Sequence, residues 1–180
     1  MARAGAQPTL TTARLVLRPL ASGDAADVQR LASVWEVANT TTNIPHPYPA
    51  GAAEAFIGRT IDGWRDDTSA TWAITREGAL IGCIGLVSVS RAHGRCSLGY
   101  WIGHDEWGRG YATEAAQPVL AWAFADGWHR VEATHMTRNP ASGRVMQKLG
   151  MQHEGRMRDY FRRSDQWEDV ELYAVVAPRE

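Results

Sequence analysis

Alternating and continuous apolar runs predict about seven strands along the chain. The stretch RLVLRPL alternates apolar and basic residues, which is typical of a strand with one buried face. The runs TWAIT and ALIGCIGLVSVS are separated by a short Arg-Glu-Gly turn, as in a β-hairpin. The predicted strands span 14–20, 71–75, 79–90, 96–103, 130–136, 151–160 and 167–176.

Apolar residues at helical spacing predict about four helices between these strands. They span 24–37, 52–66, 111–126 and 142–150. Ser22 is placed to cap the first helix. Pro118 falls inside the third helix, where it removes a hydrogen bond to the carbonyl of Glu114 and should bend the helix. The order of elements predicts an α/β (α+β) fold, with a mixed, mostly antiparallel central sheet flanked by helices.

Length and composition indicate one globular domain. The chain has 180 residues, of which 44% are hydrophobic and 22% charged. No repeat, low-complexity tract or linker divides it, so we expect a flexible tail at 1–9 and a single domain at 10–180. Four tryptophans are expected in the core, namely Trp35, Trp64, Trp72 and Trp122.

Charge and cysteine usage exclude several classes of partner. The net charge of −1 gives no global attraction to nucleic acid or to an anionic membrane. Seven basic residues and two acids lie between Arg138 and Arg163, which suits an anionic small ligand or a solvated face. Cys83 and Cys96 lack metal-binding spacing, so we expect buried free thiols and no metal. Without a signal-peptide core or an apolar run of about 18 residues, we expect a cytoplasmic protein.

The most informative turn is EWGRGYATEA, at residues 106–115, between a predicted strand and a predicted helix. Unpaired N–H groups and the helix dipole make such a helix start favourable for an anion. Gly108 and Gly110 let the backbone approach a ligand, and Arg109 adds a charge, so a phosphate or pyrophosphate is the natural occupant. The usual dinucleotide and nucleoside-triphosphate fingerprints are absent, and the turn alone also fits an ordinary helix start.

The same turn resembles the acetyl-CoA pyrophosphate loop of the GNAT acetyltransferases, Q/R-x-x-G-x-G/A, with Trp107 in place of the usual Gln or Arg. LGYWIG at 98–103 is similar to the strand before that loop in the RimJ/RimL-like branch. TRNPASGRVMQKLGM at 137–151 and EGRMRDYFRRSDQWEDVELYAV at 154–175 resemble later segments of that branch. The resemblance covers about residues 10–176, and it implies a GNAT-like fold with acetyl-CoA as co-substrate.

The resemblance also implies a set of cofactor-binding residues. Trp101, Ile102 and Gly103 would lie beside the pantetheine arm, which pairs with free backbone groups of their strand. Asn139 and Ser142 would approach the pantetheine near its sulfur. Arg144 and Lys148 would reach towards the adenosine end, although exposed helix charges fit these two equally well. The pyrophosphate loop itself would comprise Trp107, Gly108, Arg109, Gly110, Tyr111, Ala112 and Thr113.

The implied reaction is direct attack of a primary amine on acetyl-CoA in a ternary complex. We expect Ser142 to give the departing thiolate a proton or a hydrogen bond, and Asn139 to orient Ser142. Ser142 could equally cap its helix. A free backbone N–H near Ile102 is the candidate donor to the oxyanion. The glutamate that some RimL-like enzymes place in the last hairpin corresponds to Phe161. The base is therefore left open among a water chain and four side chains, Glu132, His135, Asp159 and Tyr160.

The acceptor is less constrained than the donor. His46 and Tyr48 lie on the proline-rich loop at 43–49, which in relatives lines the acceptor cleft, although a rigid surface loop is the alternative. The resemblance to the RimJ/RimL-like branch implies acetylation of a protein N-terminal α-amine. Such an amine has a pKa near 8 and needs little help from a base. A small amine, such as a polyamine, amino acid or antibiotic, is the first alternative. A non-catalytic CoA-binding module is the second, and a homodimer is left open.

Overall fold

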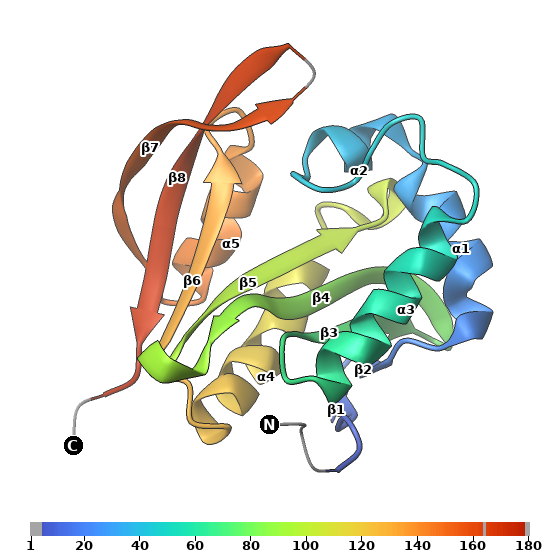
Figure 1. The fold of residues 1–180 in the computed structure, drawn as a ribbon, viewed down its shortest axis with the longest axis horizontal. Coiled ribbons are helices and arrows are strands. Elements are labelled where there is room, and N and C mark those ends of the chain that lie inside the picture. Colours follow the sequence, from blue (N-terminus) through green and yellow to red (C-terminus); the bar gives the residue numbers. More distant parts are fainter. Residues whose placement is uncertain (1–4, 164, 179–180) are drawn as a thin grey trace.

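The computed structural model describes residues 5–163 and 165–178, and it is built around one eight-stranded sheet (Figure 1). The strand order is β1-β2-β3-β4-β5-β6-β8-β7. Only the β5–β6 pair is parallel among these strands, so the expected mixed, mostly antiparallel sheet is confirmed. The bounds are β1 Leu10–Thr11, β2 Val16–Pro19, β3 Ala70–Arg76, β4 Ala79–Ser90, β5 Arg95–Ile102, β6 Arg130–Met136, β7 Gln152–Arg163 and β8 Gln166–Val176.

The extra strand is β1, whose two residues pair with Leu17 and Val16 of β2. A strand this short carries no periodicity that a sequence pattern could reveal. The N-terminal segment ahead of it, placed by the sequence in a flexible tail, makes three hydrogen bonds. Gly5 and Pro8 accept from the ring N–H groups of Trp64 and Trp72, and Gln7 donates to Thr71. Residues 1–4 of the expected tail lie outside the described residues.

The described residues contain five α-helices and a few short 3-10 turns. Their bounds are α1 Ala25–Ala32, α2 Trp35–Asn39, α3 Ala52–Arg65, α4 Tyr111–Ala125 and α5 Pro140–Lys148. The helix predicted at 24–37 is divided into α1 and α2, so that prediction is wrong in its continuity. The Ser33 hydroxyl donates to Gln29, and Val34 adopts an extended conformation, which together end α1.

The start of the first helix also differs from the prediction that Ser22 caps it. Ser22 lies inside a 3-10 turn, Ser22–Asp24, rather than capping α1. The Asp24 carboxylate accepts from the Ala21 N–H and pairs with Arg18 at 2.7 Å. The Arg18 guanidinium lowers the pKa of Asp24. The third predicted helix is confirmed as α4, which continues through Pro118 to Ala125.

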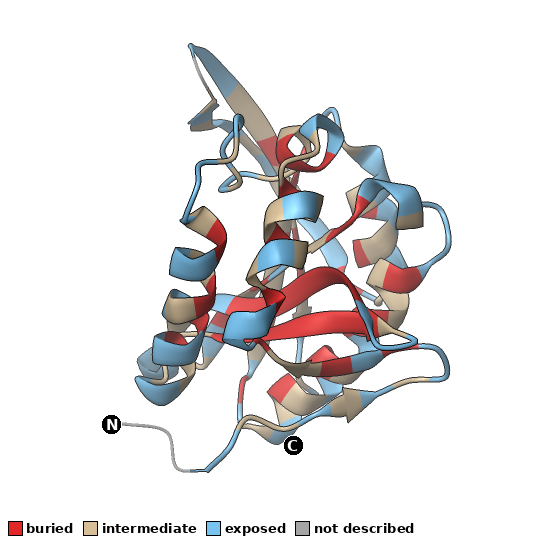
Figure 2. Cartoon of the chain, turned by 90° about the vertical axis from the view of Figure 1, so that its right-hand side faces the viewer, coloured by how far each residue is buried: buried red, intermediate tan, exposed pale blue. Residues whose placement is uncertain are grey.

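The core occupies both faces of the sheet, as the buried central strands in Figure 2 show. Trp72 and Ile74 of β3 pack with α4 on one face. Ala73, between them, packs with α1 and α3 on the other face, because successive side chains alternate across a strand. Of the expected core tryptophans, Trp72 is fully buried, and Trp64 and Trp122 pack against the core. Trp35 is half exposed and contacts His46 instead.

Two features of the sheet create space for a site. The parallel pairing of β5 with β6 ends at Ser97 and Glu132, so the two strands separate beyond that point. The β7–β8 hairpin extends past the rest of the sheet, at the upper left of Figure 1. Its register shifts between Met157 and Phe161, which inserts a bulge with Asp159 at a positive φ of 49°. The carboxyl-terminal half of β5 is therefore left without a partner on its β6 side.

Candidate active site

The unpaired half of β5 presents backbone groups to the opening between β5 and β6. Ile102, the last residue of β5, pairs with Gly82 of β4, and the N–H of the next residue, Gly103, donates to the carbonyl of Ile81. Because N–H groups alternate in direction along an antiparallel strand, the N–H of Ile102 points away from β4. The N–H of Ile102 is therefore turned towards the opening.

The turn between β5 and α4 has the backbone shape that its glycines predict. Gly108 and Gly110 have φ values of 76° and 82°, in the left-handed region, and Gly110 is the N-cap of α4. The Trp107 indole N–H donates to the carbonyl of Ile102 at 2.7 Å. The unusual Trp107 therefore fastens the turn to the end of β5 through its side chain.

Two arginines from distant parts of the chain, Arg14 between β1 and β2 and Arg76 of β3, hold the start of α4. Arg76 donates to the Tyr111 hydroxyl at 2.9 Å and pairs with Glu106 at 3.1 Å. The guanidinium of Arg14 lies 4.5 Å from the centre of the Tyr111 ring and donates to the carbonyl of Arg109. Sequence reasoning missed both arginines, because their proximity to the turn depends on the pairing of β2 with β3.

A cavity of about 400 Å³ lies between this turn and α5, and we call it the donor cavity. Two of the predicted cofactor-binding residues lie outside its lining. Gly103 faces Leu31 and β4, and Arg109 is exposed and pairs with Glu106 at 3.3 Å. Arg144 and Lys148 line the cavity and have no ion pair within the described parts of the chain. The remaining predicted residues that line it are Trp101, Ile102, Trp107, Gly108, Gly110, Tyr111, Ala112, Thr113, Asn139 and Ser142.

The start of α5 differs from the expected cap at Ser142. Asn139 is the N-cap, and its side chain accepts from the Ser142 N–H at 3.4 Å. Pro140 opens the helix, a position where its missing N–H costs no hydrogen bond. The helix therefore begins two residues before the predicted start. This leaves the Ser142 hydroxyl free of any capping role.

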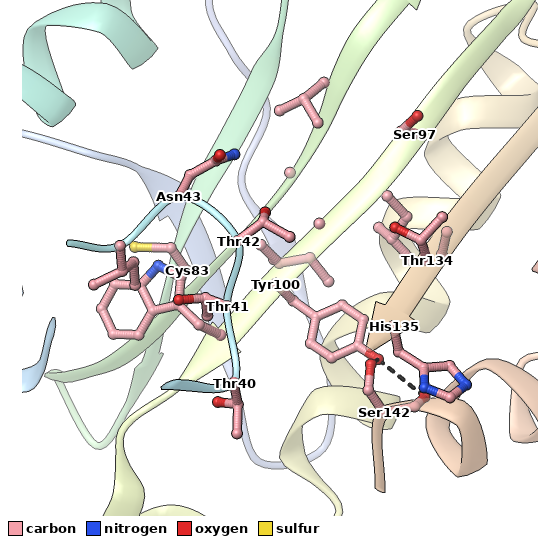
Figure 3. A pocket seen from close by; sticks show the side chains of 18 of the residues that line it. Thr40, Thr41, Thr42, Asn43, Cys83, Ser97, Tyr100, Thr134, His135 and Ser142 are labelled. Carbon is pink, nitrogen blue, oxygen red and sulfur yellow. Dashed lines mark hydrogen bonds between the residues drawn. The ribbon is translucent and has the colours of Figure 1, made fainter. Parts of the chain in front are cut away.

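The Ser142 hydroxyl instead contacts Tyr100 of β5. The two side-chain oxygens are 2.7 Å apart, and either can donate. Burial raises the pKa of Tyr100 to about 12, so its hydroxyl stays protonated at neutral pH. Figure 3 shows Tyr100 pointing towards Ser142 across the opening. Sequence reasoning missed Tyr100, although strand alternation separates it from Trp101 and places it with Leu98 and Ile102.

A second cavity of about 1070 Å³ lies on the other side of this contact, and we call it the acceptor cavity. Its walls include the 40–43 segment, β5 and β6, which Figure 3 shows at close range. Arg163, near the hairpin tip, donates to the carbonyls of Ala38 and Thr41 and so bridges the hairpin to α2. The residues that line both cavities are Thr40, Thr41, Tyr100, Trp101, Asn139 and Ser142.

The predicted acceptor residues separate into two groups. Tyr48 lines the acceptor cavity, whereas His46 is exposed, packs on Trp35 and does not line it. Phe161, at the position of the missing glutamate, also lines the cavity. The loop at 43–49 therefore contributes one of its two predicted side chains.

The candidate bases also differ in their surroundings. Glu132, His135 and Tyr160 line the acceptor cavity, and Asp159 does not. Glu132 is paired, whereas Tyr160 is 54% exposed in the hairpin bulge. The Nδ1 of His135 lies 2.8 Å from the carbonyl of Met136 and must donate to it, which leaves Nε2 as an acceptor.

The glycine turn, the separated strands and the two adjoining cavities agree with a comparison against protein families. Residues 14–152 match the model described as an acetyltransferase (GNAT) domain. The chain belongs to the GNAT acetyltransferase family. It is accordingly an acetyl-CoA-dependent N-acetyltransferase, with acetyl-CoA as its co-substrate.

Named relatives and a solved structure resemble the chain over most of its length. The chain is 31% identical to the uncharacterized N-acetyltransferase YoaA of Bacillus subtilis, over 96% of this chain and 99% of that one. It is 29% identical to the [ribosomal protein uS5]-alanine N-acetyltransferase of Escherichia coli, over 94% and 91%. The fold matches a solved RimL, a ribosomal L7/L12 α-N-protein acetyltransferase in complex with coenzyme A, with a TM-score of 0.87 at 16% identity, over 94% and 98%.

Among the described residues, no three His, Cys, Asp or Glu side chains gather where they could hold a metal ion. No helix in that part of the chain is long and apolar enough to cross a membrane. Cys83 and Cys96 are buried free thiols as expected, and burial raises the pKa of both.

Proposed function

We propose that the protein transfers the acetyl group of acetyl-CoA to the α-amine of a protein N-terminus. The observation that carries this proposal is the junction of the two cavities at Tyr100, Asn139 and Ser142. The thioester enters from the donor cavity and the amine from the acceptor cavity. The similarity to a ribosomal-protein alanine N-acetyltransferase over nearly the whole chain supports a protein N-terminus as the acceptor.

On the donor side, backbone groups do most of the binding. The N–H groups from Gly108 to Thr113 hold the pyrophosphate, assisted by the dipole of α4. Arg144 and Lys148, unpaired among the described residues, face the adenosine end and its phosphate. The pantetheine lies along the free edge of β5. Arg14 and Arg76 position the turn rather than touch the ligand.

The chemical step uses groups at the junction. The amine nitrogen attacks the thioester carbon, and the Ile102 N–H stabilises the oxyanion that forms. The C–S bond then breaks, and the thiolate takes a proton from the Ser142 hydroxyl. In the same step Tyr100, whose pKa burial raises to about 12, passes its proton to the Ser142 oxygen, and the proton that the amine releases to the base returns to Tyr100 through solvent. Asn139 fixes the turn of α5 that carries Ser142.

We assign the base to His135 rather than to Glu132 or Tyr160. The Nε2 of His135 lies over Gly143, the neighbour of Ser142, with its lone pair unused by the Met136 hydrogen bond. The Glu132 carboxylate is already occupied by Arg95 and Arg130. An α-amine with a pKa near 8 loses its proton readily, so a neutral imidazole is a sufficient acceptor.

A thiol-release assay with a panel of amines tests the proposal. Peptides with a free N-terminus should release CoA thiol from acetyl-CoA, and the same peptides with a blocked N-terminus should not. Spermidine and aminoglycosides should be poorer acceptors. Binding of acetyl-CoA without release of thiol on any amine would favour a non-catalytic module and overturn the proposal.

A small-molecule amine is the second candidate. The acceptor cavity, at about 1070 Å³, is large enough to enclose a whole small molecule. In that case a small amine, rather than any peptide, would show the highest kcat/KM in the same panel.

A further inference from the structure

Arg59 is a cation that lines the acceptor cavity without a partner. It lies on α3, is exposed, and has neither an ion pair nor a hydrogen bond from its side chain to the residues that the structure describes. Its charge reaches the nearby phenol of Tyr48, where it opposes the rise in pKa that burial causes. A guanidinium with unused donors at the rim of a cavity is suited to a carboxylate or phosphate.

The cavity holds no free carboxylate that would cancel this charge. Glu132 is the acidic residue among the described lining residues. Its oxygens lie 3.4 Å from Arg95, 3.3 Å from Arg130 and 3.5 Å from the Ser97 hydroxyl. Glu132 is therefore occupied by two cations, Arg95 of the neighbouring β5 and Arg130 of its own strand β6. Among the described lining residues, the charge left without an ion pair is that of Arg59. Glu54 of the same helix, whose charge also reaches the phenol of Tyr48, does not line the cavity.

The anion site and the reaction site lie on different walls. Arg59 belongs to α3, which contacts β3, whereas Ser142 belongs to α5, which contacts β6. The strands β4 and β5 lie between β3 and β6, so the strands that the two helices contact are three spacings apart, about 14 Å. In a free α-amino acid the amine and carboxylate are only two bonds apart. Such a molecule is much shorter than this spacing.

We propose that the acceptor carries a carboxylate or phosphate remote from its reactive amine, and that Arg59 binds this anionic group. An N-terminal segment with an acidic side chain a few residues from its α-amine has this form. A long aminoalkyl phosphate has it too. Arg59 is then the residue that sets acceptor specificity, through binding rather than chemistry. This inference rests on the proposed acetyl transfer and adds the acceptor's charge to it.

The test compares acceptors that differ in charge. Three peptides share an Ala N-terminus and carry Glu, Gln or Lys at the third and fourth positions, and a long aminoalkyl phosphate is the fourth acceptor. The intact protein should show kcat/KM about fivefold higher for the Glu peptide than for the Gln peptide, mainly through KM. The Lys peptide should be poorer still. High salt should reduce these differences, because Arg59 is exposed.

Charge reversal separates a specific role of Arg59 from a structural one. Arg59→Glu should reverse the order and favour the Lys peptide, a result that simple damage to the fold would not give. Arg65→Glu is the matched control, because Arg65 lies on the same helix, is exposed, and does not line the cavity. It should leave the wild-type order unchanged.

The outcomes also separate this inference from the proposed function. Acetylation of all three peptides with equal kcat/KM would leave the proposed function standing and overturn the role of Arg59. An unchanged order in Arg59→Glu would overturn it as well. Preference for the Glu peptide alone would identify a peptide source of the anion, and preference for the aminoalkyl phosphate alone a small-molecule source. No acetylation of any acceptor would overturn both proposals.

Discussion

At the scale of single residues, the proposed reaction uses only a few groups, which meet at the junction of the two cavities. Ser142 touches Tyr100, and the Ile102 N–H is the backbone donor turned towards the same opening. A leaving thiolate has a pKa around 8.5, so it needs only a short proton relay. Tyr100 supplies one that stays protonated, because burial raises its pKa to about 12.

Removal of either hydroxyl should slow the reaction more than it weakens cofactor binding. In Ser142→Ala we expect kcat to fall about 100-fold, the scale of one lost proton donor. In Tyr100→Phe we expect a smaller fall of about tenfold, because Ser142 keeps its own proton to give. Steady-state kinetics gives kcat, and calorimetry gives the affinity for acetyl-CoA, which should change less than threefold.

A matched control for this prediction is Ser22→Ala, because Ser22 is exposed and far from the junction in the chain. It should behave as the wild type. Turnover in Ser142→Ala equal to that of the wild type would remove Ser142 from the relay.

At the scale of elements, the site forms where β5 loses its β6 partner and where the helices α4 and α5 begin. The donor cavity forms where β5 loses its partner and α4 starts at Gly110. Asn139 and Pro140 start α5 so that Ser142 lies in its first turn, beside Tyr100. Backbone N–H groups at such starts bind anions without needing a particular side chain. The substitution of Trp107 in the family pattern is therefore compatible with binding.

Gly110→Asp should abolish binding of acetyl-CoA in calorimetry. Gly110 has a φ of 82°, which strains any side chain, and a carboxylate here would repel the pyrophosphate. Gly78→Asp is the matched control, because Gly78 has a φ of 84° in the β3–β4 turn and space around it. Gly78→Asp should pay a similar backbone cost, about 1 kcal/mol, and bind acetyl-CoA normally. Normal binding by Gly110→Asp would contradict the pyrophosphate site.

The elements also show what a sequence pattern can and cannot reveal. Helix α3 and the strands of the central meander follow from apolar periodicity, because burial on one face imposes it. The break at Ser33 could not be foreseen, because it depends on a side-chain hydrogen bond that competes with the helix. The positions of Arg14 and Arg76 beside Tyr111 depend on strand pairing over long sequence distances. Tyr100 could have been identified from the sequence, since the alternation of side chains along a strand places it on the opposite face from Trp101.

At the scale of the whole molecule, the sheet separates two layers of helices and is interrupted where β5 and β6 part. α4 covers one face and α1 and α3 the other, and the separation of β5 from β6 joins the two sides. In the proposed reaction, donor and acceptor approach from different directions and meet at Ser142. Arg163 ties the long hairpin to Ala38 across the acceptor side, and burial lowers the pKa of its guanidinium. Figure 1 shows the hairpin and α2 on opposite sides of that opening.

The measurement that tests the central claim most directly is the position of the acetyl group on a peptide that offers two amines. A peptide with an Ala N-terminus, an acidic third residue and one internal Lys is incubated with acetyl-CoA and the protein, then sequenced by tandem mass spectrometry. The account predicts one added acetyl group, on the α-amine. Acetylation of the Lys side chain, or no acetylation of the peptide, would contradict it.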